Sequence, residues 1–404
     1  MFWQGQARRQ TRTDFRDKRR KIALSDGSSS LSALGKGGVV SPDTFDDAPE
    51  RVVEVASEPL DVPNLKDART SLLNSGHYSE QTIDELLASI VLGHVILAGP
   101  PGTGKTTLAR ALARAFNAGL QIETANPEWS VFDTVGTQTL NDKGGVKSQH
   151  GIVTTAILKC ANSIISFADT GEGDQARWLL LDEMNRAEID RAFGPLFTAL
   201  SGGEEPNMVL DYIDSRPTLA VPQRFRIIAT VNEYDARFVQ SMSAALRRRF
   251  AKVLVLPPPN NVDGGIPAAE LHAAIAKSEE NLARLFPEAK GSIETISEAH
   301  KDLLRSIFGF LRESGNDGGV PIGTAVIIDV LSFMGTFAKV TELEVDVAFE
   351  VVVDRALTAR LVPALESDST RTRIGDGFPV SLRRKFPFLI NTSSRISAFL
   401  NGTD

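Results

Sequence analysis

Short, continuous apolar runs recur along the middle of the chain, each about as long as a buried β-strand. They lie at residues 94–98, 178–181, 225–231 and 252–256, and a further strand is predicted at residues 120–124. Runs without polar alternation indicate strands that are buried on both faces. The segments between them space apolar residues three or four positions apart, as an amphipathic helix does. This pattern predicts an α/β fold, with a parallel sheet that has helices on both faces.

The helices of this sheet domain are predicted at residues 80–91, 106–116, 155–168 and 189–200. Ser79 directly precedes the first of them and is a favourable helix cap. The three prolines at 257–259 then end the pattern. Earlier in the chain, serines, glycines and scattered prolines break any period. We therefore expect a disordered basic tail and linker over residues 1–62 and the sheet domain over residues 63–260.

A different pattern follows residue 260, where helical spacing occurs without strands. It marks residues 268–285, 296–312, 324–339 and 346–361. We therefore expect a mainly α-helical lid and C-terminal region over residues 261–404. The stretch after Asp368 shows no period and is expected to be irregular. Its apolar residues suggest that it packs on another part of the protein; they are Phe386, Phe388, Leu389 and Ile390.

The composition is that of an ordinary globular protein, with 42% apolar and 24% charged residues in 404. No uninterrupted apolar run reaches the about 18 residues of a membrane span, so no span and no membrane contact are expected. Cys160 is the single cysteine, which excludes an intrachain disulfide framework and a thiolate zinc cage. We expect it to be a buried, inert thiol. A cytoplasmic location fits these features.

Charge is distributed unevenly. Residues 1–21 carry eight basic and two acidic side chains, so this tail is +6 and the remaining chain −13. An acidic body argues against broad coating of nucleic acid. The basic tail could contact DNA or an acidic partner, or it could be a solvated segment without a partner.

Residues 99–106, Gly-Pro-Pro-Gly-Thr-Gly-Lys-Thr, have every fixed position of a phosphate-binding loop. They lie between a predicted strand and a predicted helix, where glycines let backbone N–H groups converge and the helix adds its positive end. Lys105 would contact the β- and γ-phosphates, and Thr106 would ligate magnesium. The predicted nucleotide-binding residues are Gly99, Pro100, Pro101, Gly102, Thr103, Gly104, Lys105, Thr106 and Thr107.

Two adjacent carboxylates, Asp182 and Glu183, follow the apolar run at 178–181. Open α/β sheets bind ligands at this end of their strands. Because neighbouring residues on a strand point in opposite directions, each carboxylate can take a separate role. Asp182 would hold magnesium through water, and Glu183 would polarise the attacking water.

Asn232 directly follows the run at 225–231. Its side-chain amide could orient the attacking water from there, although an asparagine at this position can also simply form a turn. Arg247, Arg248 and Arg249 precede Phe250. Such a cluster can be a solvated face or a set of helix C-terminal charges. It can also supply an arginine to a neighbouring subunit's nucleotide, which requires a ring.

Together these motifs resemble the AAA+ superfamily and, within it, the McrB- and MoxR-like branch. The likeness rests on segments that occur in the family's order, at residues 99–106, 182–187, 226–232 and 245–250. The second of these, Asp-Glu-Met-Asn-Arg-Ala, is more specific than the phosphate loop alone. The resemblance is strong over about residues 80–260 and extends to the helical region only in outline.

The resemblance implies roles for the site residues. Glu183 would belong to the Walker B pair with Asp182, and Asn232 would be sensor 1. Arg248, with Arg249, would be the arginine finger. It also implies a homo-oligomeric ring, usually of six subunits, with Mg²⁺ and ATP held between neighbours. Residues 126–153 and 201–222 resemble two hairpins that this branch inserts, and both would face the pore or a partner.

One feature of the chain departs from the family pattern, and another leaves the choice between ATP and GTP open. The sensor 2 position often carries an arginine, but residues 321–325 read Pro-Ile-Gly-Thr-Ala, so the role is absent or belongs to Arg355 or Arg360. The stretch from Asn232 to Asp235 has the Asn-x-x-Asp spacing of McrB-type proteins, which use GTP. Most of the superfamily uses ATP, so ATP is favoured and GTP is possible.

Three functions remain open at this point. The first is an NTP-driven ring that drives a partner encoded nearby, such as the nuclease of a McrBC-like defence system, with DNA contacted through the basic tail or the hairpins. The second is a MoxR-like chaperone for cofactor insertion or complex maturation, working with a von Willebrand A-type (VWA) partner. The third is a nucleotide-gated scaffold or DNA-binding module without turnover.

Overall fold

The computed structural model describes most of the chain beyond the basic tail. The described residues are 52–53, 55–140, 144–194, 196, 200, 207–232, 248–287, 291–313, 319–320, 322–365 and 374–402. The tail at residues 1–21 and its predicted contacts therefore lie outside the described residues, as do Arg247 and Asp235.

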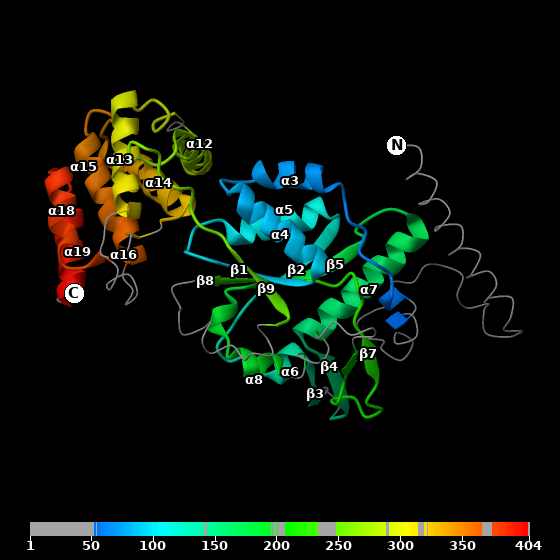
Figure 1. Cartoon of the computed structure of the whole chain (residues 1–404). Coiled ribbons are helices and arrows are strands. Elements are labelled where there is room, and N and C mark those ends of the chain that lie inside the picture. The colour runs from blue at the N-terminus through cyan, green and yellow to red at the C-terminus, as the bar shows by residue number, and fades with distance from the viewer. Residues whose placement is uncertain are drawn as a thin grey trace, which may run out of the picture. The chain divides into compact units, whose positions relative to one another are not determined.

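The first domain is built on a five-stranded parallel sheet (Figure 1). Its strands, in spatial order, are β2 (Ala118–Thr124), β5 (Ala176–Asp182), β8 (Ile227–Asn232), β1 (His94–Gly99) and β9 (Phe250–Leu254). The last strand begins two residues earlier than the apolar run predicts. The predicted α/β class with a parallel sheet is confirmed.

Helices cover both sides of this sheet. Figure 1 shows α3 (Leu65–Leu73), α4 (Glu80–Leu92) and α5 (Lys105–Ala115) gathered on one side and α7 (Ile152–Thr170) on the other. The cap predicted for α4 is present, since the Ser79 side chain accepts a hydrogen bond from the Thr82 amide. Cys160 lies fully buried on α7, where burial raises the pKa of its thiol to about 12. The thiol therefore stays protonated at neutral pH and fits the predicted inert role.

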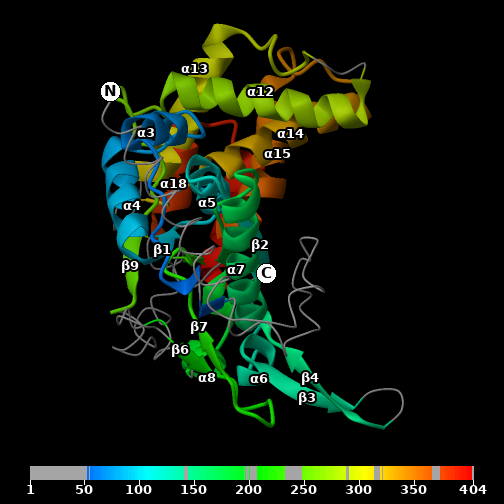
Figure 2. The same cartoon turned by 90° about the vertical axis from the view of Figure 1, so that its right-hand side faces the viewer.

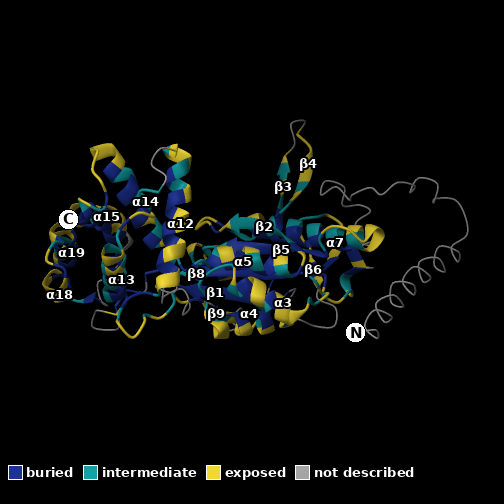
Figure 3. Cartoon of the chain, turned by 90° about the horizontal axis from the view of Figure 1, so that it is seen from above, coloured by how far each residue is buried: buried dark blue, intermediate teal, exposed yellow. Residues whose placement is uncertain are grey.

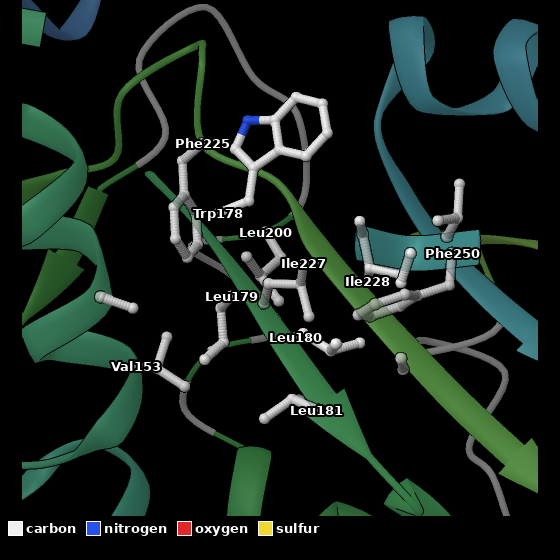
Figure 4. Packing of buried hydrophobic residues seen from close by; sticks show 14 of the residues in the cluster. Val153, Trp178, Leu179, Leu180, Leu181, Leu200, Phe225, Ile227, Ile228 and Phe250 are labelled. Atoms are coloured by element: carbon white, nitrogen blue, oxygen red, sulfur yellow. The ribbon is translucent and has the colours of Figure 1, made fainter. Parts of the chain in front are cut away.

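The core explains why the apolar strand runs lack alternation. Leu179, Leu180 and Leu181 of β5 are all fully buried, so both faces of this central strand pack against apolar side chains (Figure 4). Trp178 is also fully buried, and its indole N–H donates to the Arg224 carbonyl over 2.9 Å. This bond satisfies the polar group of a large core residue.

Two antiparallel hairpins interrupt the sheet domain. The first pairs β3 (Gly136–Leu140) with β4 (Val146–His150), and the second pairs β6 (Asn207–Val209) with β7 (Thr218–Ala220). Figures 2 and 3 show the β3–β4 hairpin projecting away from the sheet. Three short elements also lie here, namely α6 (Val131–Thr134), η3 (Met184–Arg186) and α8 (Ile189–Phe193).

The second domain is helical and has its own hydrophobic core, which gathers buried residues between Ile266 and Leu400. Its first helices lie close to the predicted bounds; they are α12 (Ala268–Leu285), α13 (Glu298–Glu313), α14 (Thr324–Thr341) and α15 (Phe349–Ala356). A π-helical turn, Leu357–Leu361, and α16 (Val362–Leu365) complete the last predicted helix.

The expectation of an irregular segment after Asp368 is wrong for the residues described there. They form α18 (Phe378–Lys385) and α19 (Ile390–Asn401). For α19 the reason is a tertiary cap: buried Asp354, on α15, accepts hydrogen bonds from the amides of Asn391 and Thr392, each over 2.9 Å. A cap from a distant helix leaves no local sequence signal.

Two helices in the described part are long and apolar enough to span a membrane by length and composition alone. They are α7 and α14, with 44% and 33% of their most apolar window buried inside the protein. This observation is weak evidence for a membrane span, because core helices of globular proteins pass the same test. The expectation of no span rested on uninterrupted apolar runs, so the two predicted helices were not marked as candidate spans.

We expect the stability of the sheet domain to depend on the neutral form of His94. The His94 Nδ1 accepts a hydrogen bond from the Ile227 amide over 3.0 Å, and burial lowers the pKa of His94 from 6.5 to about 3. Below pH 6.5 the unfolded chain takes up a proton on this imidazole while the folded chain does not. The free energy of unfolding should therefore fall from about pH 6.5 towards about pH 3.

Urea unfolding near pH 7 and near pH 5 tests this dependence on His94. The matched variant is His94→Asn, which keeps a hydrogen-bond acceptor but does not titrate, so it should show a smaller decrease between the two pH values. Equal decreases in the wild type and the variant would contradict the assignment.

Candidate functional site

The motif residues meet at one edge of the sheet because they follow adjacent parallel strands. Gly99 ends β1, Asp182 ends β5 and Asn232 ends β8, and β8 lies between the other two. Asn232 is the register partner of Gly99. The carboxyl ends of three strands thus form one site, as is usual for open α/β sheets.

The phosphate loop connects β1 to α5 and depends on two glycines. Gly102 and Gly104 have φ angles of +77° and +81°, in the left-handed region that favours glycine. Lys105 begins α5 and is only 7% exposed. Its Nζ donates to the carbonyls of Gly99 and Pro100 over 2.9 and 2.7 Å, so the ammonium lies against its own loop.

Tyr78, in the connection between α3 and α4, supports this loop through a contact that was not predicted. Its hydroxyl donates to the Gly104 carbonyl over 3.0 Å. Burial raises the pKa of Tyr78 to about 12, so it remains a neutral donor. A Cβ at Gly104 would lie 2.7 Å from the Tyr78 oxygen. Nothing in the local sequence around Tyr78 indicates this contact.

Asp182 is the centre of the polar contacts. Its Oδ1 accepts hydrogen bonds from Thr106 Oγ1 over 2.9 Å and from Thr230 Oγ1 over 2.6 Å. Hydroxyl and carboxylate oxygens are the ligands that Mg²⁺ prefers, so Thr106 and Asp182 fit the predicted cation. Thr230 was missed, although it lies two residues before Asn232 and therefore on the same face of β8.

Glu183 lies directly after β5 in a strained conformation. Its φ angle is +53°, which is uncommon for a residue with a side chain. Its amide donates to Thr230 Oγ1 over 2.9 Å, while its carboxylate pairs with Arg186 Nε over 2.7 Å. Arg186 belongs to the Asp-Glu-Met-Asn-Arg-Ala stretch, and only its short spacing from Glu183 could have indicated this ion pair.

The other predicted site residues have less defined surroundings. Asn232 is half-buried, and its main-chain N–H donates to Asn185 Oδ1 over 3.3 Å. Arg248 is exposed and Arg249 half-buried, in the turn before β9. In the phosphate loop, Pro101 and Thr107 are exposed. Buried Thr103 donates from Oγ1 to the Pro100 carbonyl over 3.0 Å.

The lid reaches the phosphate loop without an arginine. At the start of α14, the Ala325 amide donates to the Gly102 carbonyl over 3.1 Å. Of the two arginines proposed as substitutes, Arg355 is exposed on α15, and the Arg360 guanidinium lies 5.6 Å from the centre of the Phe333 ring. The hydrogen bond that links the lid to the loop is therefore a main-chain contact.

Among the residues that the structure describes, no group of three or more His, Cys, Asp or Glu side chains could hold a metal ion. A cation bound at Thr106 and Asp182 would consequently need further oxygens, and the phosphates of a nucleotide can supply them.

Comparison with known proteins agrees with this geometry. A sequence model of the AAA domain, dynein-related subfamily, matches residues 94–250, from the start of β1 to the start of β9. No curated protein matches the chain. The match contains the phosphate loop, both carboxylates, Asn232 and the two arginines. Residues 94–250 therefore form an AAA domain of the dynein-related subfamily.

Proposed function

We propose that the chain binds ATP with Mg²⁺ and hydrolyses it, and that this turnover drives a partner protein. The convergence of Thr106 and Thr230 on one oxygen of Asp182, next to the phosphate loop, is the observation that carries the proposal. It combines a hydroxyl ligand with a carboxylate that a second residue holds in place.

The loop residues bind the triphosphate in this proposal. The glycines allow the amides of residues 99–107 to face phosphate oxygens, and the N-terminus of α5 adds positive potential. The Lys105 ammonium, which contacts two loop carbonyls, reaches the β- and γ-phosphates by a small side-chain rotation. Bound Mg²⁺ would neutralise phosphate charge, with Thr106 and Asp182 holding it.

Glu183 and Asn232 handle the attacking water in this proposal. The Glu183 carboxylate accepts the water's proton, and the side-chain amide of Asn232 orients the water beside the γ-phosphate. The ion pair between Glu183 and Arg186 has side chains that are 34% and 56% exposed. A partly exposed pair is weak, so Glu183 can exchange Arg186 for water when nucleotide binds.

We favour ATP because most of the superfamily uses it. GTP is the alternative, motivated by the Asn-x-x-Asp spacing from Asn232 to Asp235. We further propose a hexameric ring in which Arg248, with Arg249, completes the neighbour's site. Arg248 is exposed beside β9, one of the two edge strands of the sheet, where a second subunit can reach it.

The β3–β4 hairpin provides a surface for the partner. Its outermost described pair, Leu140 opposite Val146, is 76% and 64% exposed. His150 Nδ1 and Tyr212 Oη, 2.6 Å apart, join this hairpin to the loop between β6 and β7. Lys147 is the charged residue in its two described strands. The described strands, with one lysine and an exposed apolar pair, favour a protein partner over DNA, and the basic tail is the alternative contact for DNA.

The partner remains a choice between two classes. A nuclease encoded nearby, as in McrBC-like systems, is the first, and a VWA-type protein working with a MoxR-like chaperone is the second. Both require the same motor and the same cytoplasmic location.

We expect Lys105→Ala to weaken nucleotide binding by about 10- to 100-fold, because a charge-assisted contact to phosphate is lost. Glu183→Gln should instead retain binding but lower turnover by about 100-fold or more, because the amide cannot accept a proton. Equilibrium binding and steady-state hydrolysis with ATP and GTP measure both effects. Undiminished turnover in Glu183→Gln would contradict the assignment of the base.

We expect Thr230→Val to destabilise the protein by about 1–3 kcal/mol, because the Glu183 amide loses its acceptor. Turnover should also fall about tenfold or more, since Asp182 loses one of its two donors and is less well placed. Thr230→Ser keeps the hydroxyl and should retain most of the activity. Equal hydrolysis rates for the valine and serine variants would show that the hydroxyl does not position Asp182.

We expect mixtures of two inactive variants to regain hydrolysis if neighbours share a site. In a ring of Arg248→Ala and Glu183→Gln chains, some interfaces combine an intact Glu183 with an intact Arg248. The control mixture is Lys105→Ala with Glu183→Gln, because both changes damage the nucleotide site of their own chain. A rate no higher than the sum of the separate variants, as expected for the control, would argue against shared sites.

A further inference from the structure

The start of the lid helix α14 touches the phosphate loop backbone to backbone. The Ala325 amide donates to the Gly102 carbonyl, and Gly323 lies against the peptide that joins Gly102 to Thr103. A Cβ at Gly323 would lie 2.2 Å from the Gly102 carbonyl carbon and 2.6 Å from the Thr103 nitrogen. Because the colliding atoms are backbone atoms, no side-chain rotation could relieve this overlap.

Gly323 is required for the contact and not for its own conformation. Its φ and ψ angles are −78° and 162°, a region that any residue can adopt. Replacing it by alanine would therefore add no local strain of its own. The only penalty is separation of the lid from the loop.

The contact acts on a peptide that belongs to the phosphate cradle. A trans peptide directs its C=O and its N–H to opposite sides. A lid that holds the Gly102 C=O consequently also fixes the direction of the Thr103 N–H, away from the lid. Gly102 has a positive φ and little steric restraint of its own, so an external contact can select its orientation.

A buried ion pair holds the start of α14 in place. Glu270 on α12 is fully buried, and its carboxylate accepts from Arg312 on α13 over 2.6 and 2.9 Å. The same network binds the residues on either side of Gly323. Arg312 Nε donates to the Ile322 carbonyl, and Thr324 Oγ1 donates to the Glu270 carboxylate. Arg312 also donates to the Pro258 carbonyl in the segment that leads from β9 to the lid.

We propose that Gly323 and Ala325 are positioning residues for nucleotide binding, forming a main-chain clamp through which the lid sets the Gly102–Thr103 peptide. This clamp links the loop to the lid where no arginine is present at residues 321–325. The inference rests on the proposed function, because it assumes that the loop binds nucleotide. It implies that nucleotide binding and lid position are coupled through this peptide.

The test compares Gly323→Ala with Gly377→Ala. Gly377 also has a negative φ angle, −77°, and a Cβ there would meet nothing within 4 Å. We expect Gly323→Ala to raise KM for Mg-ATP about tenfold with a smaller change in kcat, because a displaced loop binds phosphate less well. Gly377→Ala should match the wild type. An unchanged KM in a folded Gly323→Ala protein would overturn the clamp.

Hydrogen exchange on the wild-type chain tests the clamp even if Gly323→Ala does not fold. With Mg²⁺ and a non-hydrolysable ATP analogue, exchange of the Ala325 amide should slow at least about threefold, as expected when binding stabilises a local contact. The Ser381 amide, bonded to Gly377 within α18, should not change. An Ala325 rate unaffected by bound nucleotide would overturn the inference. Absence of any nucleotide binding by the wild type would instead refute the proposed function.

Discussion

Two threonine hydroxyls from different elements donate to a single oxygen of Asp182, and the rest of the site depends on this convergence. Thr106 lies in the first turn of α5, and Thr230 lies on β8. Both can reach Asp182 only because β5, β8 and β1 are adjacent and parallel. Thr230 Oγ1 also accepts a hydrogen bond from the Glu183 main-chain amide, so one side chain orients both carboxylate residues.

The sheet domain and the lid have separate hydrophobic cores, which allows them to move without loss of packing inside either. At the phosphate loop the Ala325 amide donates to the Gly102 carbonyl and Gly323 lies against the Gly102–Thr103 peptide, and a buried network inside the lid supports this contact. In the clamp proposed above, a movement of the lid would change the orientation of this one peptide. This arrangement suits a protein whose lid responds to the state of its nucleotide.

The sequence was informative where the signal was local. The phosphate loop and the Asp182–Glu183 pair each occupy a few consecutive residues, and strand and helix spacing predicted the sheet domain. Thr230, Tyr78 and Gly323 could not be predicted in this way, because their partners are distant in sequence and are fixed by strand register or domain packing. The α19 helix was missed for the same reason, since its cap, Asp354, lies on another helix.

Titration calorimetry with ATP, in the presence of Mg²⁺ and then of a chelator, tests the central claim most directly. If Thr106 and Asp182 hold a cation between protein and phosphate, the wild-type chain should bind ATP with Mg²⁺ and bind it more weakly without. Absence of detectable affinity for either ATP or GTP with Mg²⁺ would contradict the account.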